Sequence, residues 1–338
     1  MASNTKKITD EVSFFFRPSL KSFGKLAEEA AQLEDMKLLF GRFIPEGTLI
    51  HFPSPRGVGK SFFCMQLCTA VAYEQPEFLG EPITLHGNTL YINNELSEKV
   101  LRRRSEKLMS NLPFSPATRF KPRAYTTKNS LADDLPAIIQ IVERLKPVLI
   151  IIDNLRMAFA DTDTNSNKEI TRMMFTLLAL CESSKTAIVV TDHFRKHTSS
   201  LLSDSDLQAG SGVKTDLADG DFFLRKSAQD KNLRLLKRGK SRHFEEADRA
   251  KLLRLNPQTL WFELVEDDVN EAEHIGIKSI KNKEEQLDMA KLLQENGKSI
   301  REIAGILGKS KSTVQRWLNK PEGDANGTDI AEERRKAQ

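Results

Sequence analysis

Residues 54–61, Ser-Pro-Arg-Gly-Val-Gly-Lys-Ser, have the residue types and the spacing of a phosphate-binding loop. An apolar stretch, 48–52, precedes this segment and an amphipathic stretch, 62–72, follows it, which predicts a strand, a loop and a helix. Gly57 and Gly59 allow the backbone to turn so that successive N–H groups point at phosphate oxygens. The positive N-terminal end of the helix adds to this attraction. The pattern therefore predicts nucleotide binding.

The residues of this loop have separate expected tasks. Lys60 is expected to reach the β- and γ-phosphates of ATP, and the Ser61 hydroxyl to hold a bridging Mg²⁺ ion. The usual pattern begins with glycine, and here that position is Ser54. Because serine tolerates most turn geometries, we interpret the segment as a variant of the loop. The residues expected to bind the nucleotide are Ser54, Pro55, Arg56, Gly57, Val58, Gly59, Lys60, Ser61 and Phe62.

Two carboxylates end predicted strands near this loop. Asp153 follows five apolar residues, 148–152, as in a buried parallel strand whose carboxyl end faces the phosphates. It is expected to share the Mg²⁺ site with Ser61. Glu95 ends the predicted strand 87–95, the next strand after the phosphate-loop helix, where a carboxylate can orient and deprotonate the attacking water. A solvated strand end is the alternative interpretation of Glu95.

Strands and helices alternate along most of the chain. This order predicts an α/β fold with a mostly parallel sheet and flanking helices. Further strands are expected at 187–191, 221–224, 233–236 and 260–265, and helices at 131–145 and 167–183.

Composition excludes several classes of protein. Of 338 residues, 39% are hydrophobic and 29% are charged, as in ordinary soluble proteins. Cys64, Cys68 and Cys181 lie in apolar stretches with neither zinc spacing nor a disulfide framework, which indicates buried thiols in a reducing compartment. No stretch approaches the roughly 20 apolar residues of a membrane span, and no signal peptide is evident. We therefore expect a cytoplasmic protein.

The motifs together resemble the RecA superfamily and, within it, the RepA-type replicative helicases of plasmids and other mobile elements. The resemblance covers about residues 35–265 and rests on Pro45-Glu-Gly47, Glu95, 152–156 with 161–167, Val190-Thr-Asp-His193 and 208–216. It implies a RecA-like fold, ATP hydrolysis with Glu95 as the catalytic glutamate, and a homo-oligomer, with a hexameric ring favoured. The family often has two histidines at the end of the fourth stretch, and Asp192 replaces the first of them here.

The resemblance also implies roles for His193 and for the loop that follows it. His193 is either a sensor of the γ-phosphate or simply a hydrogen-bonded residue at a strand end. Residues 194–210 either line a central channel and contact single-stranded DNA, or form a surface loop without a partner. In the first case Arg195 and Lys196 are the expected phosphate contacts.

A basic cluster follows the predicted strand 233–236. In hexameric relatives, a basic pair leaving this strand reaches the nucleotide of the neighbouring subunit and stabilises charge on the transferred phosphoryl group. The candidates are Lys237, Arg238, Lys240 and Arg242, and their spacing does not choose between them. A solvated hairpin is the alternative.

The C-terminal region has the pattern of a small all-α helix-turn-helix domain of the resolvase type. Ser299 and Glu302 form a capping box at the start of the second of three predicted helices. Ile303, Ala304, Leu307, Val314 and Leu318 are expected to form its core. Over residues 276–320, ten basic and five acidic residues give a net charge of +5. The side chains expected to face duplex DNA are Lys309, Lys311, Ser312, Thr313, Gln315 and Arg316.

The sequence also predicts domain boundaries. We expect an N-terminal arm over 1–34, an ATPase core over 35–267, a linker over 268–283, the helix-turn-helix domain over 284–320 and a disordered tail over 321–338. The apolar triplet Phe14-Phe-Phe16 is either a strap for a neighbouring subunit or a cap on the same core.

Three functions are compatible with these features. The favoured one is a ring-forming helicase of a mobile element, with ATP and Mg²⁺ as cofactors and DNA as partner. The second is an ATP-dependent switch that assembles on DNA and recruits a protein without unwinding. The third is a DNA-binding protein with a degenerate nucleotide pocket, which the intact Lys60, Ser61, Glu95 and Asp153 argue against.

Overall fold

The protein is described here from a computed structural model. The structure describes residues 19–117, 119–155, 167–193, 212–245, 247, 249–274, 286–287, 290–291, 293–294, 298–307 and 309–319. The chain divides into two units, one ending at Ile275 and one beginning at Gly276, and each is described by itself.

The first unit is built on a large mixed sheet. Within the described residues its nine strands are β3 (Leu49–Ser54), β6 (Thr89–Asn93), β7 (Pro122–Thr126), β8 (Leu149–Asp153), β9 (Ala187–His193), β10 (Gly220–Lys226), β11 (Leu233–Ser241), β12 (Ala250–Leu255) and β13 (Phe262–Val269). Their order is β13-β12-β11-β10-β3-β9-β8-β6-β7. The strands from β10 to β7 are parallel, and β11, β12 and β13 extend the sheet in antiparallel fashion. The predicted α/β fold with a mostly parallel sheet is therefore confirmed.

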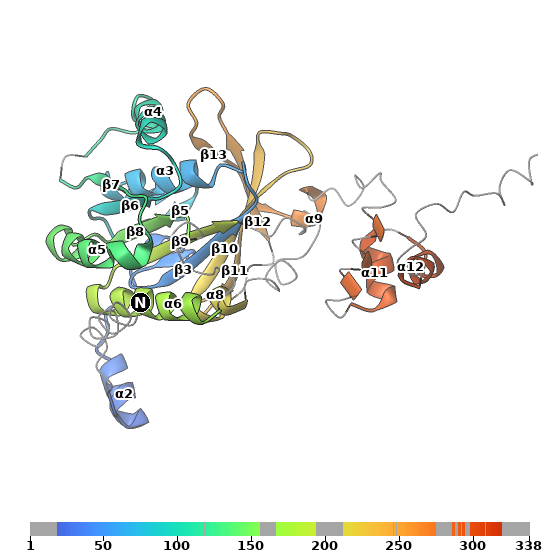
Figure 1. The fold of residues 1–338 in the computed structure, drawn as a ribbon, viewed down its shortest axis with the longest axis horizontal. Coiled ribbons are helices and arrows are strands. Elements are labelled where there is room, and N and C mark those ends of the chain that lie inside the picture. Colours follow the sequence, from blue (N-terminus) through green and yellow to red (C-terminus); the bar gives the residue numbers. More distant parts are fainter. Residues whose placement is uncertain are drawn as a thin grey trace, which may run out of the picture. The chain divides into compact units, whose positions relative to one another are not determined.

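Helices cover both faces of the sheet (Figure 1). Within the described residues, the helices of this unit are α2 (Phe23–Ala30), α3 (Lys60–Ala72), α4 (Glu98–Met109), α5 (Leu131–Leu145), α6 (Asn167–Ser184), α8 (Gly212–Leu217) and α9 (Glu271–His274). Two short hairpins, β1 (Leu38–Phe40) with β2 (Ile44–Pro45) and β4 (Glu77–Phe78) with β5 (Glu81–Pro82), complete it. The helix α3 lies on one face of the sheet, and α5 and α6 lie on the other.

Strand β8 shows why both faces are covered. Ile151 packs into the cluster beneath α3, while Ile150 and Ile152 pack into the cluster beneath α5 and α6. All three are buried, so this strand is apolar on both sides and its carboxyl end is fixed in position.

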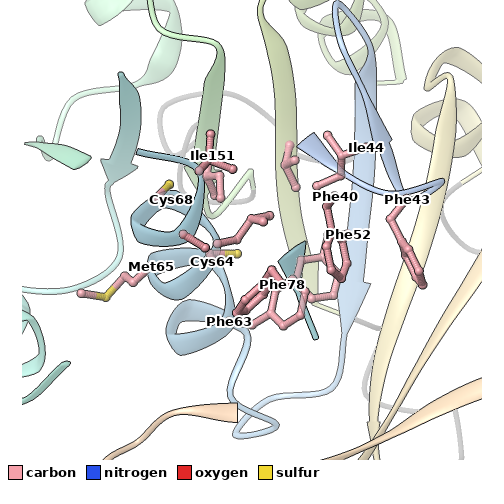
Figure 2. Close-up of a cluster of buried hydrophobic side chains, with 14 of the residues drawn as sticks. Phe40, Phe43, Ile44, Phe52, Phe63, Cys64, Met65, Cys68, Phe78 and Ile151 are labelled. Carbon is pink, nitrogen blue, oxygen red and sulfur yellow. The ribbon is translucent and has the colours of Figure 1, made fainter. Parts of the chain in front are cut away.

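Phenylalanines pack helix α3 against the sheet (Figure 2). Phe63 on α3 makes an edge contact with Phe52 on β3, with ring centroids 5.4 Å apart. Phe52 stacks on Phe222 of β10 at 4.1 Å, and Phe40 packs on Phe63 at 5.6 Å. Fully burying each such side chain contributes about 1.5–3 kcal/mol. This packing fixes the start of α3 relative to the end of β3.

Most predicted elements are present, and the differences have local causes. Helix α5 has the predicted bounds. Strands β7 and β12 were not predicted, because Pro122 and Arg123 open the first, and the second, Ala-Lys-Leu-Leu-Arg-Leu, lacks β-branched residues. The predicted linker 268–283 also differs, since β13 runs to Val269 and α9 follows within the first unit.

The second unit contains α11 (Ile300–Leu307) and α12 (Lys311–Leu318), and residues 286, 287, 290, 291, 293 and 294 are helical. The predicted capping box is present, because Ser299 N–H donates to Glu302 Oε2 at 2.8 Å and Glu302 N–H donates to Ser299 Oγ at 3.4 Å. Trp317 is buried and Leu318 is only partly buried, so Trp317 takes the core position that the sequence analysis gave to Leu318.

Among the described residues, no helix combines the length and the apolar character that crossing a bilayer requires.

Candidate nucleotide-binding site

The predicted phosphate-binding loop joins β3 directly to α3. Gly57 has φ of 67° and Gly59 has φ of 106°, values that L-residues with side chains rarely adopt. A Cβ on Gly59 would also lie 2.9 Å from the ring of Phe262, so both position and conformation require glycine there. Helix α3 begins at Lys60 without a side-chain cap and without an acidic residue in its first turn. Its first N–H groups are therefore suited to an anion.

Ser54 explains how the loop tolerates the missing first glycine. The φ angle of Ser54 is not in the left-handed region, so a side chain at this position does not strain the backbone. The Ser54 hydroxyl donates to the Pro53 carbonyl at 2.6 Å and accepts the Leu224 N–H at 3.2 Å. The serine thus ties the end of β3 to β10. Of the other loop residues, Val58 is buried, Arg56 is exposed, and Pro55 and Phe62 are partly buried.

Lys60 is buried, and its ammonium contacts three acceptors of the protein itself. It donates to the carbonyls of Ser54 at 2.9 Å and Asp192 at 2.7 Å, and lies 3.0 Å from His193 Nδ1. Burial lowers the pKa of Lys60 to about 8, although the carboxylate of Asp153 opposes this shift. A phosphate that binds Lys60 must replace these acceptors.

These contacts assign the tautomer of His193. An ammonium can only donate, so Nδ1 accepts the Lys60 proton and Nε2 carries the hydrogen of the neutral ring. Nε2 lies 3.8 Å from Glu95 Oε2. The imidazole therefore lies between Lys60 and Glu95, with its donor side toward the carboxylate.

Glu95 is the carboxylate at the open side of this group, and its side chain is 41% exposed. The amide of Asn154 donates to Glu95 Oε2, on the same oxygen that His193 faces. Hydrogen bonding to His193 is the main cause that lowers the pKa of Glu95, and burial acts in the opposite direction. The carboxylate is ionised at neutral pH and has a second oxygen with which to accept a proton from water.

Asp153 and Ser61 are linked through a tyrosine that the sequence analysis missed. The Tyr91 hydroxyl donates to Asp153 Oδ2, and Thr191 donates to Oδ1 at 2.7 Å. Burial, followed by the charge of Asp153, raises the pKa of Tyr91 well above its usual value, and a hydrogen bond with Ser61 opposes this. Ser61, Tyr91 and Asp153 therefore form one network of oxygen atoms. Hydroxyl and carboxylate oxygens suit Mg²⁺, which prefers few protein ligands beside phosphate and water.

Asp192, near the end of β9, anchors α8. Its carboxylate accepts from Lys214, and His51 Nε2 lies 3.9 Å away. Burial alone would raise the pKa of Asp192, but His51 and Lys214 hold it well below its usual range. The residue that offers its carbonyl to Lys60 is thereby fixed to the following helix.

Three of the four basic finger candidates lie within a strand, and Arg242 directly follows it. Strand β11 extends to Ser241, so Lys237, Arg238 and Lys240 lie within the strand and do not leave it. Lys237 donates to Glu271 at 3.1 Å, and Lys240 donates to the Thr215 carbonyl at 3.3 Å. The strand runs on because its antiparallel pairing with β10 continues to Ser241.

The two arginines of this cluster also have intramolecular partners. Arg238 donates to the Glu245 carbonyl at 2.8 Å, and its guanidinium lies 5.9 Å from the Phe244 ring centroid. Burial lowers the pKa of Arg238. Arg242 forms a 3.0 Å ion pair with Asp219. The structure therefore gives each candidate a contact within its own subunit.

Several predicted residues lie outside the described residues, namely Phe14-Phe-Phe16, residue 156, residues 161–166, and residues 194–211, which include Arg195 and Lys196.

The predicted DNA-facing side chains lie on or before α12. Lys309, Lys311, Ser312, Gln315 and Arg316 are exposed, while Val314 and Trp317 are buried. Thr313 is partly buried, its N–H donates to Ser310 Oγ at 3.2 Å, and its hydroxyl lies 2.8 Å from that atom. The helix thus presents a polar, basic surface and packs its apolar side inward.

Comparison with known proteins agrees with this division. Residues 18–199, more than half of the chain, match the family model of an AAA domain. Residues 281–328 match that of a homeodomain-like domain. Comparison with curated proteins gave no match. A similar solved structure is a KaiC-like protein of the hyperthermophilic archaeon Pyrococcus horikoshii OT3, 14% identical, covering 66% of this chain and 93% of that chain with a TM-score of 0.47.

Proposed function

The chain belongs to the AAA domain family, and from this premise we propose that it is a ring-forming motor of a mobile element that couples ATP hydrolysis to movement on single-stranded DNA. An ATPase domain and a DNA-binding helix-turn-helix region in one chain support an ATP-dependent function on DNA. The observation that carries the proposal is the chain of contacts from Lys60 through His193 to Glu95.

The proposed chemistry assigns a task to each residue of this chain. Lys60 and the N–H groups of the loop hold the β- and γ-phosphates, and Ser61 and Asp153 hold Mg²⁺, which neutralises charge on those phosphates when bound. Glu95 orients the attacking water and accepts its proton. When Lys60 turns to the phosphates, His193 Nδ1 loses its donor. The imidazole, and with it Asp192 and α8, then respond to the nucleotide.

The direct test is steady-state ATP hydrolysis without DNA, with single-stranded DNA and with duplex, together with unwinding of a forked substrate. Stimulation by single strands with unwinding is the expected result. Stimulation by duplex without unwinding would instead identify a switch that assembles on DNA. If the protein hydrolyses no ATP and binds duplex DNA equally well with and without nucleotide, both the motor and the switch would be contradicted.

The buried ammonium gives a second prediction, on pH. Above its pKa of about 8, Lys60 is neutral in the free protein, and bound phosphates favour its charged form. When ADP binds at a pH above 8, Lys60 should therefore take up a proton. The affinity for ADP should then decrease with rising pH, by up to about tenfold per pH unit. Below that pH, Lys60 is already charged, so affinity should level off.

Calorimetry at pH 7.5 and 9, in buffers that differ in ionisation enthalpy, measures this proton directly. Both values lie above the second pKa of a phosphate, about 6. The groups whose charges act on Lys60 are Asp153, Cys64, Asp192 and Glu95. Lys60→Arg is the control, because a guanidinium stays charged and should bind ADP without this pH dependence. Equal affinity of the unmodified protein at both pH values would refute the assignment.

A further inference from the structure

A lysine from a neighbouring strand contacts the turn that carries Glu95. Lys128 follows β7, the strand next to β6 at the edge of the sheet. Its ammonium donates to the carbonyls of Asn94, Glu95 and Leu96 at 3.2, 3.2 and 3.1 Å. An ammonium has three protons, and here three successive carbonyls receive them.

The same turn is fixed from inside by Asn93. The Asn93 side chain accepts the Leu96 N–H at 3.0 Å and donates to the Leu96 carbonyl at 2.9 Å. It also lies 3.4 Å from Thr126 Oγ1 of β7, and Thr127 N–H donates to the Asn93 carbonyl at 3.0 Å. The backbone around Glu95 is therefore held by the end of β7 as well as by its own strand.

We propose that Lys128 is a positioning residue for hydrolysis, which fixes the backbone of residues 94–96 and so sets the place of the Glu95 carboxylate. The inference rests on the proposed role of Glu95. Lys128 acts on the backbone, because its ammonium donates to three main-chain carbonyls. A donor that holds carbonyls can be replaced by another donor, whereas a neutral apolar chain leaves these three carbonyls without the lysine's hydrogen bonds.

The reaction rate depends strongly on the position of a catalytic base. A displacement of about 1 Å in a catalytic group can cost about 10²-fold in rate. The Lys128 ammonium donates to residues 94–96, whereas ATP affinity depends on the phosphate-binding loop at 54–61. The expected signature is therefore a loss in kcat at nearly constant nucleotide affinity.

The test compares Lys128→Met with Lys128→Arg. We expect Lys128→Met to lower kcat by about 10- to 100-fold, with ADP affinity within about twofold and an unchanged melting temperature. Lys128→Arg should restore most of the loss, because the guanidinium also donates to carbonyls. Lys121→Met, at an exposed lysine just before β7, is the charge-matched control and should hydrolyse ATP normally.

A double-mutant cycle with Glu95→Gln tests whether Lys128 acts through Glu95. If Lys128 acts through Glu95, adding Lys128→Met to Glu95→Gln should leave the residual single-turnover rate unchanged. Additive losses would overturn the inference, and so would wild-type kcat in Lys128→Met or a parallel loss of affinity and melting temperature. Normal turnover in Glu95→Gln would instead refute the proposed role of the base itself.

Discussion

Glu95→Gln is expected to lower steady-state ATP hydrolysis by about 10²- to 10⁴-fold and to leave ATP affinity within about threefold. The amide of glutamine has nearly the shape of the carboxylate but cannot accept a proton from water. The groups that hold the phosphates keep their own hydrogen bonds, because the Lys60 ammonium donates to the carbonyls of Ser54 and Asp192 and not to Glu95. It contacts His193, which faces Glu95.

The measurement pairs turnover with binding of a fluorescent ATP analogue. Glu98→Gln is the matched control, since Glu98 is an exposed carboxylate that pairs with Arg102 on α4 and should be silent. A Glu95→Gln protein that hydrolyses ATP at the normal rate would remove the base assignment. One that no longer binds nucleotide would show that Glu95 supports the site instead of acting on water.

Segments that are strongly apolar, or that have glycines or capping residues at their ends, could be predicted from the sequence alone. The loop at 54–61 lies between β3 and α3 because its glycines supply two left-handed conformations. Strand β8 was evident because its apolar run ends in a charge. Helix α5 was predicted to the residue, since Ser130 caps it and Lys146 ends it in a left-handed conformation.

The partners of the site could not be predicted, because they depend on strand order. Tyr91 reaches Asp153 only since β6 lies next to β8, and Thr191 reaches it from β9 on the other side. Nothing local in the sequence relates these three positions. Lys128 reaches the Glu95 turn for the same reason, because β7 pairs with β6.

The basic cluster at residues 237–242 shows a second limit of prediction from sequence. A run of lysine and arginine favours an exposed turn, yet pairing with β10 continues β11 through it. Glu271 of α9 then neutralises Lys237, and the same carboxylate pairs with Arg225 at 2.9 Å. These contacts join residues far apart in the chain, so charge pattern alone assigned Lys237 to the wrong kind of segment.

The contacts of α9 determine where the DNA-binding unit can be removed. A chain that ends at Ile275 keeps Glu271 with Arg225 and Lys237, and keeps His274 within 3.1 Å of Ser227. We expect it to lose at least about 10³-fold in affinity for a duplex selected from a random pool, the usual gap between specific and non-specific binding. Its ATP hydrolysis without DNA should stay within about twofold, because the described residues that we assign to the nucleotide site all precede Ile275.

Ending the chain at Val269 should give a different result. It removes Glu271, the carboxylate that pairs with the buried Arg225 and the partly buried Lys237, and breaking a buried ion pair costs about 3–5 kcal/mol. At about 2–4 °C per kcal/mol, the melting temperature should fall by on the order of 10 °C, and Glu271→Gln should reproduce much of this loss in the full chain. The measurement is duplex affinity, for both truncated chains and for a full chain in which Lys311, Gln315 and Arg316 are changed to alanine. This comparison separates a loss of DNA recognition from a loss of folding stability. Retained specific binding in the chain ending at Ile275 would place DNA recognition in the ATPase unit, because that chain keeps this unit with its ion pairs intact.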